Sequence, residues 1–159
     1  MIFSEHDLKR EVTKVQPQMA IETTRELFNA LIAHGVSETQ LLNKSGINLQ
    51  ELQESDGRYP VTSHLELWKT GESLLNLNAI GLHMGAKSDP FSRGVVGLAF
   101  TASKDLQKAI DNKIRYTKIL AEHISLEFEQ NETAFSITYS ILEGNFHRYE
   151  IEREFEGLL

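Results

Sequence analysis

Histidines and carboxylates are the residue types in this chain that could carry acid–base or metal chemistry. The 159 residues include six histidines and 23 acidic residues. No two histidines lie three to five positions apart, so one helix face cannot present a pair of imidazoles to a metal ion. Motifs typical of zinc proteases, serine nucleophile elbows and phosphate-binding glycine loops do not occur. The absence of cysteine also removes disulfides and thiolate nucleophiles.

The carboxylates do not form a recognisable catalytic pair either. Glu127 and Glu129, and the glutamates between 150 and 156, alternate with other residues as a solvated face would. A general acid and a general base need a shaped, partly desolvated pocket, and no pattern in the sequence marks one. We therefore expect no catalytic residues, no metal site, no cofactor and no enzymatic activity.

Aromatic side chains indicate a different kind of site, a small-molecule cavity. Core packing is the ordinary role of such rings, but ligand pockets are also mostly apolar, with a few placed polar groups. Arg93 lies in a loop between two apolar segments and can supply the polar group, although an ordinary surface arginine is the alternative. We predict a ligand site formed by the only tryptophan, Trp68, together with Arg93, Phe100 and Tyr116.

Among the elements that must position these residues, the stretch 91–120 is the most clearly patterned. Its apolar run 95–100 predicts a short helix that is buried on all sides. Ser103 is suited to cap a second helix, with Asp105 in its first turn. Apolar residues then recur at helical spacing up to Leu120, which predicts a longer surface helix whose stripe faces the core.

Helical patterns also fill the chain before this stretch. Apolar residues from 18 to 33 recur at helical spacing and end at a His-Gly pair, which is a helix stop. Ser63 and Glu66 form a capping-box pattern, which predicts the start of the helix that bears Trp68. Residues 80–85 predict a short apolar helix, in which Gly81 indicates close packing because glycine lowers helix propensity.

After residue 121 the apolar period changes from that of a helix to that of a strand. Residues 124–129 and 135–141 alternate between apolar and polar side chains around a turn, which predicts a β-hairpin with one apolar face. The final segment, 146–159, fits both a strand and a helix, and periodicity alone does not decide between them. The predicted fold class is α+β but mainly α, a bundle of short and medium helices with a hairpin near the C-terminal end.

Charge and hydropathy indicate which partners and which cellular compartment we expect for the chain. A net charge of −7 opposes binding to nucleic acid, because such affinity comes largely from basic residues. The N-terminal residues lack the apolar core of a signal peptide. The longest apolar run is far shorter than the roughly 20 residues needed to cross a bilayer. We expect a cytoplasmic protein without membrane or nucleic-acid contact, with a polar arm at 1–16 and one domain at 17–159.

The order of these segments resembles a known family. First come an Asp-Gly-Arg-Tyr-Pro-Val stretch at 56–61, the tryptophan helix at 65–68 and the helix with two glycines at 80–85. Then follow the Gly-flanked apolar run at 91–103, the start of the amphipathic helix at 106–110 and the hairpin at 124–141. Together they resemble the N-terminal effector domain of AraC-family bacterial transcription regulators, often called arabinose-binding-like, over residues 17–159. Each segment is a packing pattern, so the specificity lies in their order and spacing. The polar N-terminal arm and Thr101 depart from the family pattern.

The resemblance implies a ligand-sensing and self-associating module whose DNA-binding helix-turn-helix pair lies in a C-terminal region absent from this chain. The implied partners are a small-molecule effector of unknown identity, a second copy in a homodimer, and promoter DNA through that missing region. The resemblance also favours a helix after the hairpin. Effectors vary across the family, so it transfers no ligand residues. The alternative function is a protein–protein interaction or dimerisation module without a small-molecule ligand.

Overall fold

A computed structural model describes residues 16–54, 57–75, 77, 79–86, 89, 91, 94–141 and 147–156. The strands are β1 (Gln18–Ala20), β2 (Arg58–Pro60), β3 (Ile124–Gln130) and β4 (Phe135–Ile141). The helices are α1 (Ile21–Ala33), α2 (Glu38–Ser45), α3 (Leu49–Leu52), α4 (Val61–Leu75), α5 (Ile80–Gly85), α6 (Gly94–Thr101), α7 (Leu106–Leu120) and α8 (Arg148–Glu156). This order confirms the predicted fold class, mainly α with a hairpin followed by a helix.

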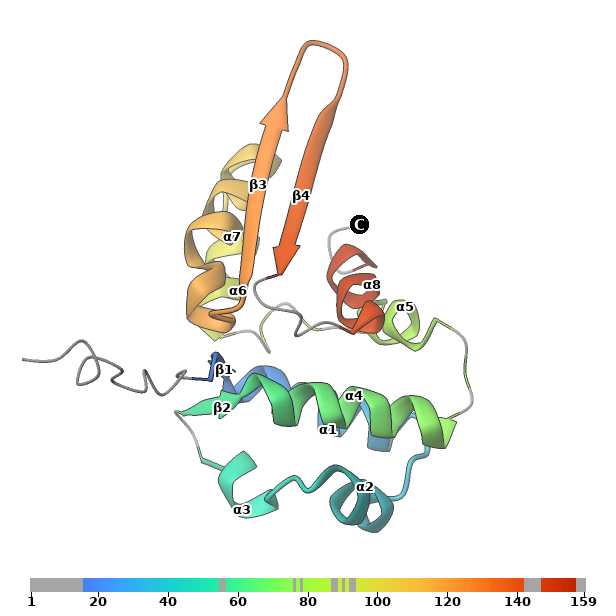
Figure 1. The fold of residues 1–159 in the computed structure, drawn as a ribbon. Helices are drawn as coiled ribbons and strands as arrows, with labels where there is room; N and C mark the ends of the chain where they lie inside the picture. The colour runs from blue at the N-terminus through green and yellow to red at the C-terminus, as the bar shows by residue number, and fades with distance from the viewer. Residues whose placement is uncertain are drawn as a thin grey trace, which may run out of the picture.

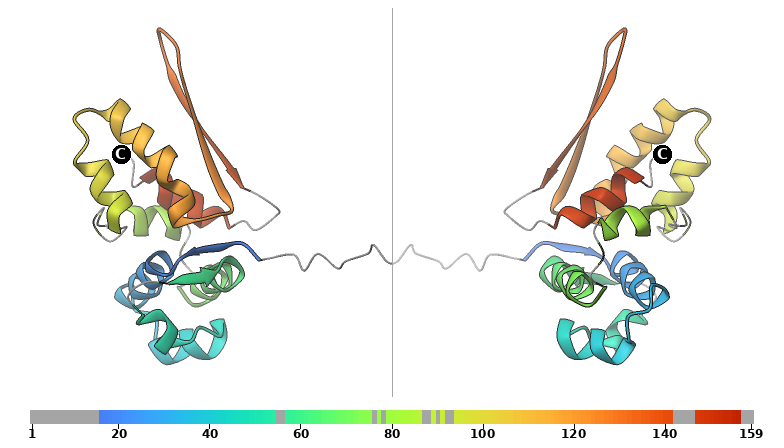
Figure 2. Two further views of the ribbon diagram at one scale, coloured as in Figure 1. Left: turned by 90° about the vertical axis from the view of Figure 1, so that its left-hand side faces the viewer. Right: turned by 90° about the vertical axis from the view of Figure 1, so that its right-hand side faces the viewer.

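The helices and strands form three tiers, which Figure 1 shows from bottom to top. In the lowest tier α2 and α3 pack beneath α1 and α4. Above α4 lie α5 and α8, which pack against each other, and beside them the helix pair of α6 and α7. The hairpin of β3 and β4 rises along α7 and extends away from the helical body, as both side views in Figure 2 show.

Two short strands join the start of the described chain to α4. β1 and β2 are antiparallel, with Met19 opposite Tyr59. The helix α4 follows β2 directly at Val61, whose amide donates a hydrogen bond to the Pro17 carbonyl at 3.1 Å. Ser63 and Glu66 therefore lie inside α4, and the prediction that they open this helix as a capping box is wrong. The adjoining chain, rather than a side chain, satisfies this first amide of the helix.

The predicted hairpin and the helix after it are both confirmed. β3 and β4 pair over their whole lengths, from Ile124 opposite Ile141 to Gln130 opposite Phe135. The helix α8 follows at Arg148, as the family resemblance favours. The order of these elements along the chain is therefore β3, β4 and then α8.

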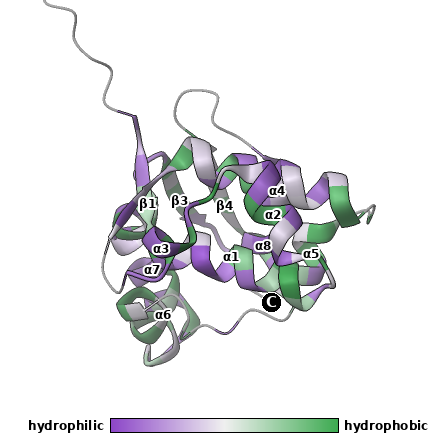
Figure 3. Ribbon diagram, turned by 90° about the horizontal axis from the view of Figure 1, so that it is seen from below, coloured by the Kyte–Doolittle hydropathy of each residue, from purple (hydrophilic) through white to green (hydrophobic). Residues whose placement is uncertain are grey.

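The structure corrects two predictions for the stretch 91–120. Asp105 caps α7, since its carboxylate accepts a hydrogen bond from the Lys108 amide at 2.8 Å. Ser103 instead donates to the Ala99 carbonyl, so it belongs to the end of α6. The helix α6 is also not buried on all sides, because Val95 and Leu98 are 67% and 53% exposed. Figure 3 shows this hydrophobic helix at one side of the molecule, where it packs against α7 and leaves its outer face uncovered.

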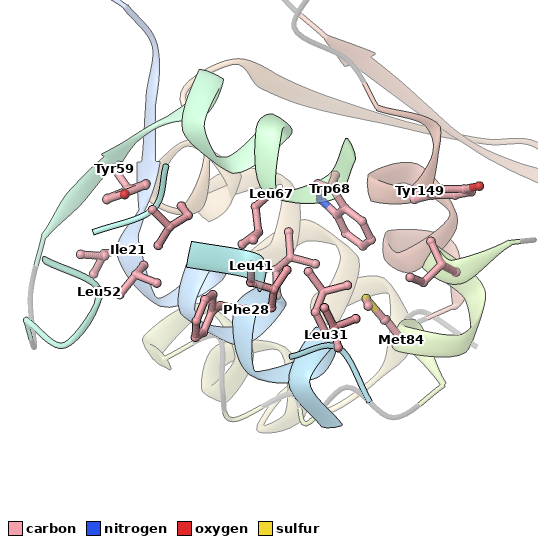
Figure 4. Close-up of a cluster of buried hydrophobic side chains, with 14 residues drawn as sticks. Ile21, Phe28, Leu31, Leu41, Leu52, Tyr59, Leu67, Trp68, Met84 and Tyr149 are labelled. Carbon is pink, nitrogen blue, oxygen red and sulfur yellow. The ribbon is translucent and has the colours of Figure 1, made fainter. Parts of the chain in front are cut away.

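The main hydrophobic core centres on α1 and α4 and includes residues of the tiers below and above them. Figure 4 shows Trp68 there, with Leu31 and Leu67 nearby and Met84 and Tyr149 contributed by α5 and α8. Removing a fully buried aromatic side chain of this kind costs about 3–5 kcal/mol of stability. A smaller cluster of buried residues joins β1, the start of α4 and the base of β3, namely Met19, Val61, Leu65, Ala121 and Ile124.

Candidate functional site

An open, shallow groove lies between α7, the hairpin and α8; its enclosed volume is only about 20 Å³, and the rest of it opens to solvent. Its walls come from four separate elements, because α7 and α8 lie on either side of the base of the hairpin. Most of the lining atoms are apolar. The lining residues are Ile110, Lys113 and Ile114 of α7, Leu126 of β3, Ile137 and Tyr139 of β4, and Glu154 and Phe155 of α8.

Local periodicity explains why these side chains face the groove. On α7, residues 110, 113 and 114 are three and four positions apart and share one helix face. On the hairpin, Leu126 lies directly opposite Tyr139, and Ile137 shares their face because alternate strand residues point the same way. The apolar stripe of α7 and one face of the hairpin therefore form two walls of the groove, and α8 covers the space between them only in part.

One ion pair crosses the groove between its two helices. Lys113 Nζ of α7 lies 3.0 Å from Glu154 Oε2 of α8, and these side chains are only 13% and 20% exposed. Such a pair is screened less by salt than a pair in open solvent. It places one positive and one negative group at the margin of an otherwise apolar surface, where each can meet a polar atom of a bound molecule.

Three of the four residues predicted to bind a ligand lie elsewhere in the fold. Trp68 is fully buried in the core on α4, whereas Phe100 on α6 and Tyr116 on α7 are half-buried. The rings that contact Trp68 in the described structure belong to His64, His147 and Tyr149. Arg93 falls outside the described residues. Trp68, Phe100 and Tyr116 do not line the groove, and contact of all four predicted residues with a ligand stays a prediction.

Sequence reasoning found the faces that form the groove but not the groove itself. The apolar stripe of α7 and the apolar face of the hairpin were both recognisable from their periods. The stripe of α7 was expected to face the core, and the hairpin was expected only to have one apolar face, because a sequence pattern shows which side chains share a face and not whether another element covers them. The ion pair of Lys113 and Glu154 joins residues far apart in the chain and left no local signal.

Trp68 belongs to a buried polar cluster beneath α8. Its indole Nε1 donates a hydrogen bond to His64 Nε2 at 3.0 Å, and His64 Nδ1 lies 3.1 Å from Thr24 Oγ1. Since Nε2 accepts, Nδ1 carries the proton of the neutral ring and donates to Thr24. Burial, followed by the positive charge of Arg153, lowers the pKa of His64 well below its ordinary value of 6.5. His64 is therefore held neutral as a connector between α1 and α4.

Polar contacts fasten α8 to the helices below it. Tyr149 donates to Glu72 Oε1 of α4 at 2.9 Å, and Arg153 Nη2 lies 2.6 Å from Glu26 Oε2 of α1. Burial and then the bond to Glu72 raise the pKa of the Tyr149 hydroxyl above its ordinary value of 10. One face of α8 thus holds the lower tiers while another face lines the groove, so a shift of α8 would be felt on both sides.

A second buried pair, His123 and Glu150, lies one helical turn along α8 from the groove-lining Glu154. His123 Nε2 is 3.7 Å from Glu150 Oε1, and the two side chains are 0% and 5% exposed. Within the part of the chain that the structure describes, neither ring nitrogen of His123 and not the second oxygen of Glu150 makes a hydrogen bond. Polar groups this buried are normally paired, so the contact is a costly one.

The described residues contain neither a metal-binding group nor a membrane-spanning helix. Among the described residues, no three His, Asp or Glu side chains are grouped so that they could hold a metal ion. Nor does any helix within the same ranges have the length and apolar character to cross a membrane.

Comparison with known proteins gives the class to which this domain belongs. Residues 35–159 match the family described as the arabinose-binding domain of AraC transcription regulators, N-terminal part, and the chain belongs to this family. The ornithine utilization regulator of Pseudomonas aeruginosa is a relative, 26% identical over 101 residues. The aligned part is 64% of this chain and 30% of that regulator, so the chain spans less than a third of the relative. The resemblance inferred from segment order is confirmed, and the family marks a ligand-sensing regulatory domain.

Proposed function

We propose that this domain senses a small, largely apolar effector in the groove between α7, the hairpin and α8. The observation that carries the proposal is an open, apolar groove bridged by a largely buried ion pair in a domain of a ligand-sensing family. Burial of apolar area supplies binding energy in proportion to the area removed from water, whereas the polar groups orient the ligand. The groove offers both.

The lining favours a ligand with an aliphatic or aromatic body and a polar end. The body packs against Ile114, Leu126 and Phe155, and the polar end meets Lys113 or Glu154 at the margin. An anionic end competes with Glu154 for Lys113, a cationic end competes with Lys113 for Glu154, and a zwitterion pairs with both. The relative named for ornithine utilization places amino acids, ornithine among them, on the panel to test.

The helix α8 is the element through which occupancy would be communicated. It lines the groove with Glu154 and Phe155 and is fastened to the lower tiers through Tyr149 and Arg153. An effector that binds one position of α8 better than another shifts the population toward that position. In the whole regulator this shift controls promoter binding by a region outside this chain. We also propose, on the family's pattern, that the regulator is a cytoplasmic homodimer.

Thermal denaturation with a panel of fatty acids, aromatic acids, amino acids and sugars tests whether the domain binds a small molecule. A ligand at a hundredfold excess over its Kd stabilises the folded state by about 2.7 kcal/mol, which is readily seen. Groove-filling substitutions Ile114→Phe and Ile137→Phe should then weaken binding by roughly tenfold or more, while their folded signals persist. No stabilisation by any class of molecule supports the alternative, an association module without a small ligand.

The same experiment separates the groove from the site predicted from the sequence. Phe100→Leu and Tyr116→Phe alter half-buried rings that do not line the groove. If the effector lies in the groove, these two variants keep the affinity of the unaltered domain. If they lose it and the groove-filling variants keep it, the effector contacts the residues predicted around Trp68, Arg93, Phe100 and Tyr116 instead.

A further inference from the structure

Toward the base of the hairpin, the groove ends at three buried polar side chains. One turn beyond Lys113 on α7 lies Thr117, and one turn before Glu154 on α8 lies Glu150. His123 directly precedes β3 and contacts Glu150, which joins the base of the hairpin to α8. Because Thr117, His123 and Glu150 are all buried, this end of the groove is closed to solvent.

Glu150 differs from three other carboxylates at α8, each of which lies beside a permanent cation. Those pairs are Lys113 with Glu154 at 3.0 Å, Arg153 with Glu26 at 2.6 Å and Arg148 with Glu152 at 3.8 Å. Glu150 instead lies beside His123, which is charged only when it is protonated. The 3.7 Å between His123 Nε2 and Glu150 Oε1 exceeds the length of charge-assisted hydrogen bonds, about 2.7–2.9 Å. Among the described residues, Glu150 is therefore a buried carboxylate without a permanent cation.

The pair of His123 and Glu150 also has hydrogen-bonding capacity that the described structure does not use. Burying a carboxylate is costly unless a cation and hydrogen bonds replace its water. Within the described ranges, Glu150 Oε2 and both ring nitrogens of His123 make no hydrogen bond. A neutral imidazole keeps one ring nitrogen as an acceptor. The pair thus presents acceptors that suit a positively charged group with several N–H donors.

We propose that the polar end of the effector is an ammonium group, which binds Glu150 and His123 at the closed end of the groove. This inference rests on the proposed function and narrows its ligand class to molecules with an apolar body and an ammonium end. An ammonium has three donors and no acceptor, which matches two carboxylate oxygens and one ring nitrogen. A carboxylate end is repelled by Glu150, and a hydroxyl end brings no charge to it.

The position of Glu150 also links binding of such an amine to α8. Glu150 and Glu154 share one face of the helix and lie about 5.4 Å apart along its axis. Because Glu150 is closed to solvent, the ammonium reaches it only when α8 moves away from the hairpin. Binding therefore favours a displaced position of α8, the element through which occupancy is communicated in the proposed function.

Three probes of equal chain length test which charge the groove accepts. They are hexylamine, 1-hexanol and hexanoate, with Kd values measured by titration calorimetry on the 159-residue chain at about pH 7.5, where the amine is protonated and the acid ionised. Hexylamine should bind roughly tenfold more tightly than 1-hexanol, because hydrogen bonds to charged groups are stronger than neutral ones. Hexanoate should bind more weakly than 1-hexanol. Equal Kd values for hexylamine and 1-hexanol overturn the proposal.

Glu150→Gln assigns this preference to one carboxylate, because it removes the charge and keeps the shape. It should raise the Kd of hexylamine roughly tenfold and leave that of 1-hexanol unchanged. Glu38→Gln, the same change at an exposed site of α2, should alter neither Kd. If the two variants weaken hexylamine equally, the amine is attracted by the net charge of −7 rather than by Glu150, and the proposal is wrong.

Ile137→Phe separates failure of the ammonium site from failure of the groove. Ile137 lines the groove, so the larger ring should weaken binding of all three probes. If hexylamine and 1-hexanol bind equally and both lose affinity in Ile137→Phe, the groove binds apolar molecules and the ammonium site is contradicted. If no probe binds, or if Ile137→Phe changes no Kd, the ammonium site and the groove of the proposed function are both contradicted.

Discussion

Gly81 of α5 packs directly against the main chain of Tyr149 in α8. A Cβ atom at Gly81 would overlap the Tyr149 carbonyl oxygen, and one at Gly85, a turn later, would meet the Arg153 carbonyl oxygen at 2.8 Å. The two helices therefore approach backbone to backbone, as the sequence predicted for Gly81 on the ground of close packing. This contact sets the position of α8, which also lines the groove.

Gly81→Ala should consequently destabilise the domain. Alanine gains about 1 kcal/mol of helix propensity over glycine, but the methyl group forces α8 away, and overpacking of this kind typically costs about 1–3 kcal/mol. We expect a net loss in the free energy of unfolding, measured by urea denaturation with the fluorescence of the single tryptophan. Gly57→Ala is the matched control, because a Cβ there meets Ile21 at an ordinary 3.5 Å. A gain in stability for Gly81→Ala would show that α5 and α8 are not in close contact.

Burial of His64 predicts a pH dependence of stability. Its pKa is lower in the folded chain than its ordinary 6.5, so below about pH 6.5 the unfolded chain binds a proton that the folded chain does not. Stability should be greatest above that pH and fall as the pH decreases, by at most about 1.4 kcal/mol per pH unit for this one group. Urea denaturation at a series of pH values measures this slope.

His64→Gln should flatten the slope between about pH 6.5 and 5. Glutamine can accept from the Trp68 indole and donate to Thr24, but it does not titrate. Its stability at pH 7 should be lower because its shape differs from that of the ring. His83→Gln, at an exposed position of α5, is the control, because it leaves the same number of histidines as His64→Gln does. Equal slopes for the His64 variant and the unaltered chain would mean that His64 does not cause the pH dependence.

The ion pair across the groove should be worth more than an exposed pair of the same residue types. Lys113 and Glu154 are 13% and 20% exposed, whereas Lys69 and Glu66 on α4 are 60% and 49% exposed. In double-mutant cycles with Lys→Met and Glu→Gln, we expect a coupling energy of about 1 kcal/mol for the groove pair and below about 0.5 kcal/mol for the exposed pair. Added salt should reduce the second more than the first. Equal coupling energies would place Lys113 in open solvent.

Local patterns predicted most of this fold because they are written in neighbouring residues. The alternation in β3 and β4, the stripe of α7 and the Gly after α1 each follow from spacings within a few positions. The β1–β2 pair has three residues per strand and no such pattern, since its pairing joins segments distant in the chain. The start of α4 was misplaced for the same reason, because the Val61 amide bonds to Pro17 rather than to a local cap.

The site was harder to predict than the fold because it depends on what covers each face. The run of α6 is apolar all round, yet Val95 and Leu98 are exposed because the packing of α6 against α7 covers only one side. The groove arises in the same way, from a stripe and a sheet face that α8 covers in part. Composition identifies an apolar surface that is more stable when another element covers it. Whether it is covered depends on the packing of elements that are distant in the sequence.

The buried pair of His123 and Glu150 predicts an unusual pattern of mutational effects. Within the described structure the two groups lie 3.7 Å apart and make no hydrogen bond through either ring nitrogen or the second carboxylate oxygen. His123→Leu leaves the Glu150 carboxylate buried beside a hydrocarbon, which should cost about 3 kcal/mol or more of stability. Adding Glu150→Leu removes that carboxylate, and replacing a whole buried pair by apolar residues is often neutral or stabilising. The double variant should therefore unfold at a higher urea concentration than His123→Leu alone. His83→Leu, at an exposed position, should change stability by less than about 0.5 kcal/mol. If the effects of the two buried substitutions simply add, His123 and Glu150 do not interact in the folded chain. The face of α8 that carries Glu150 would then be held by its apolar contacts alone.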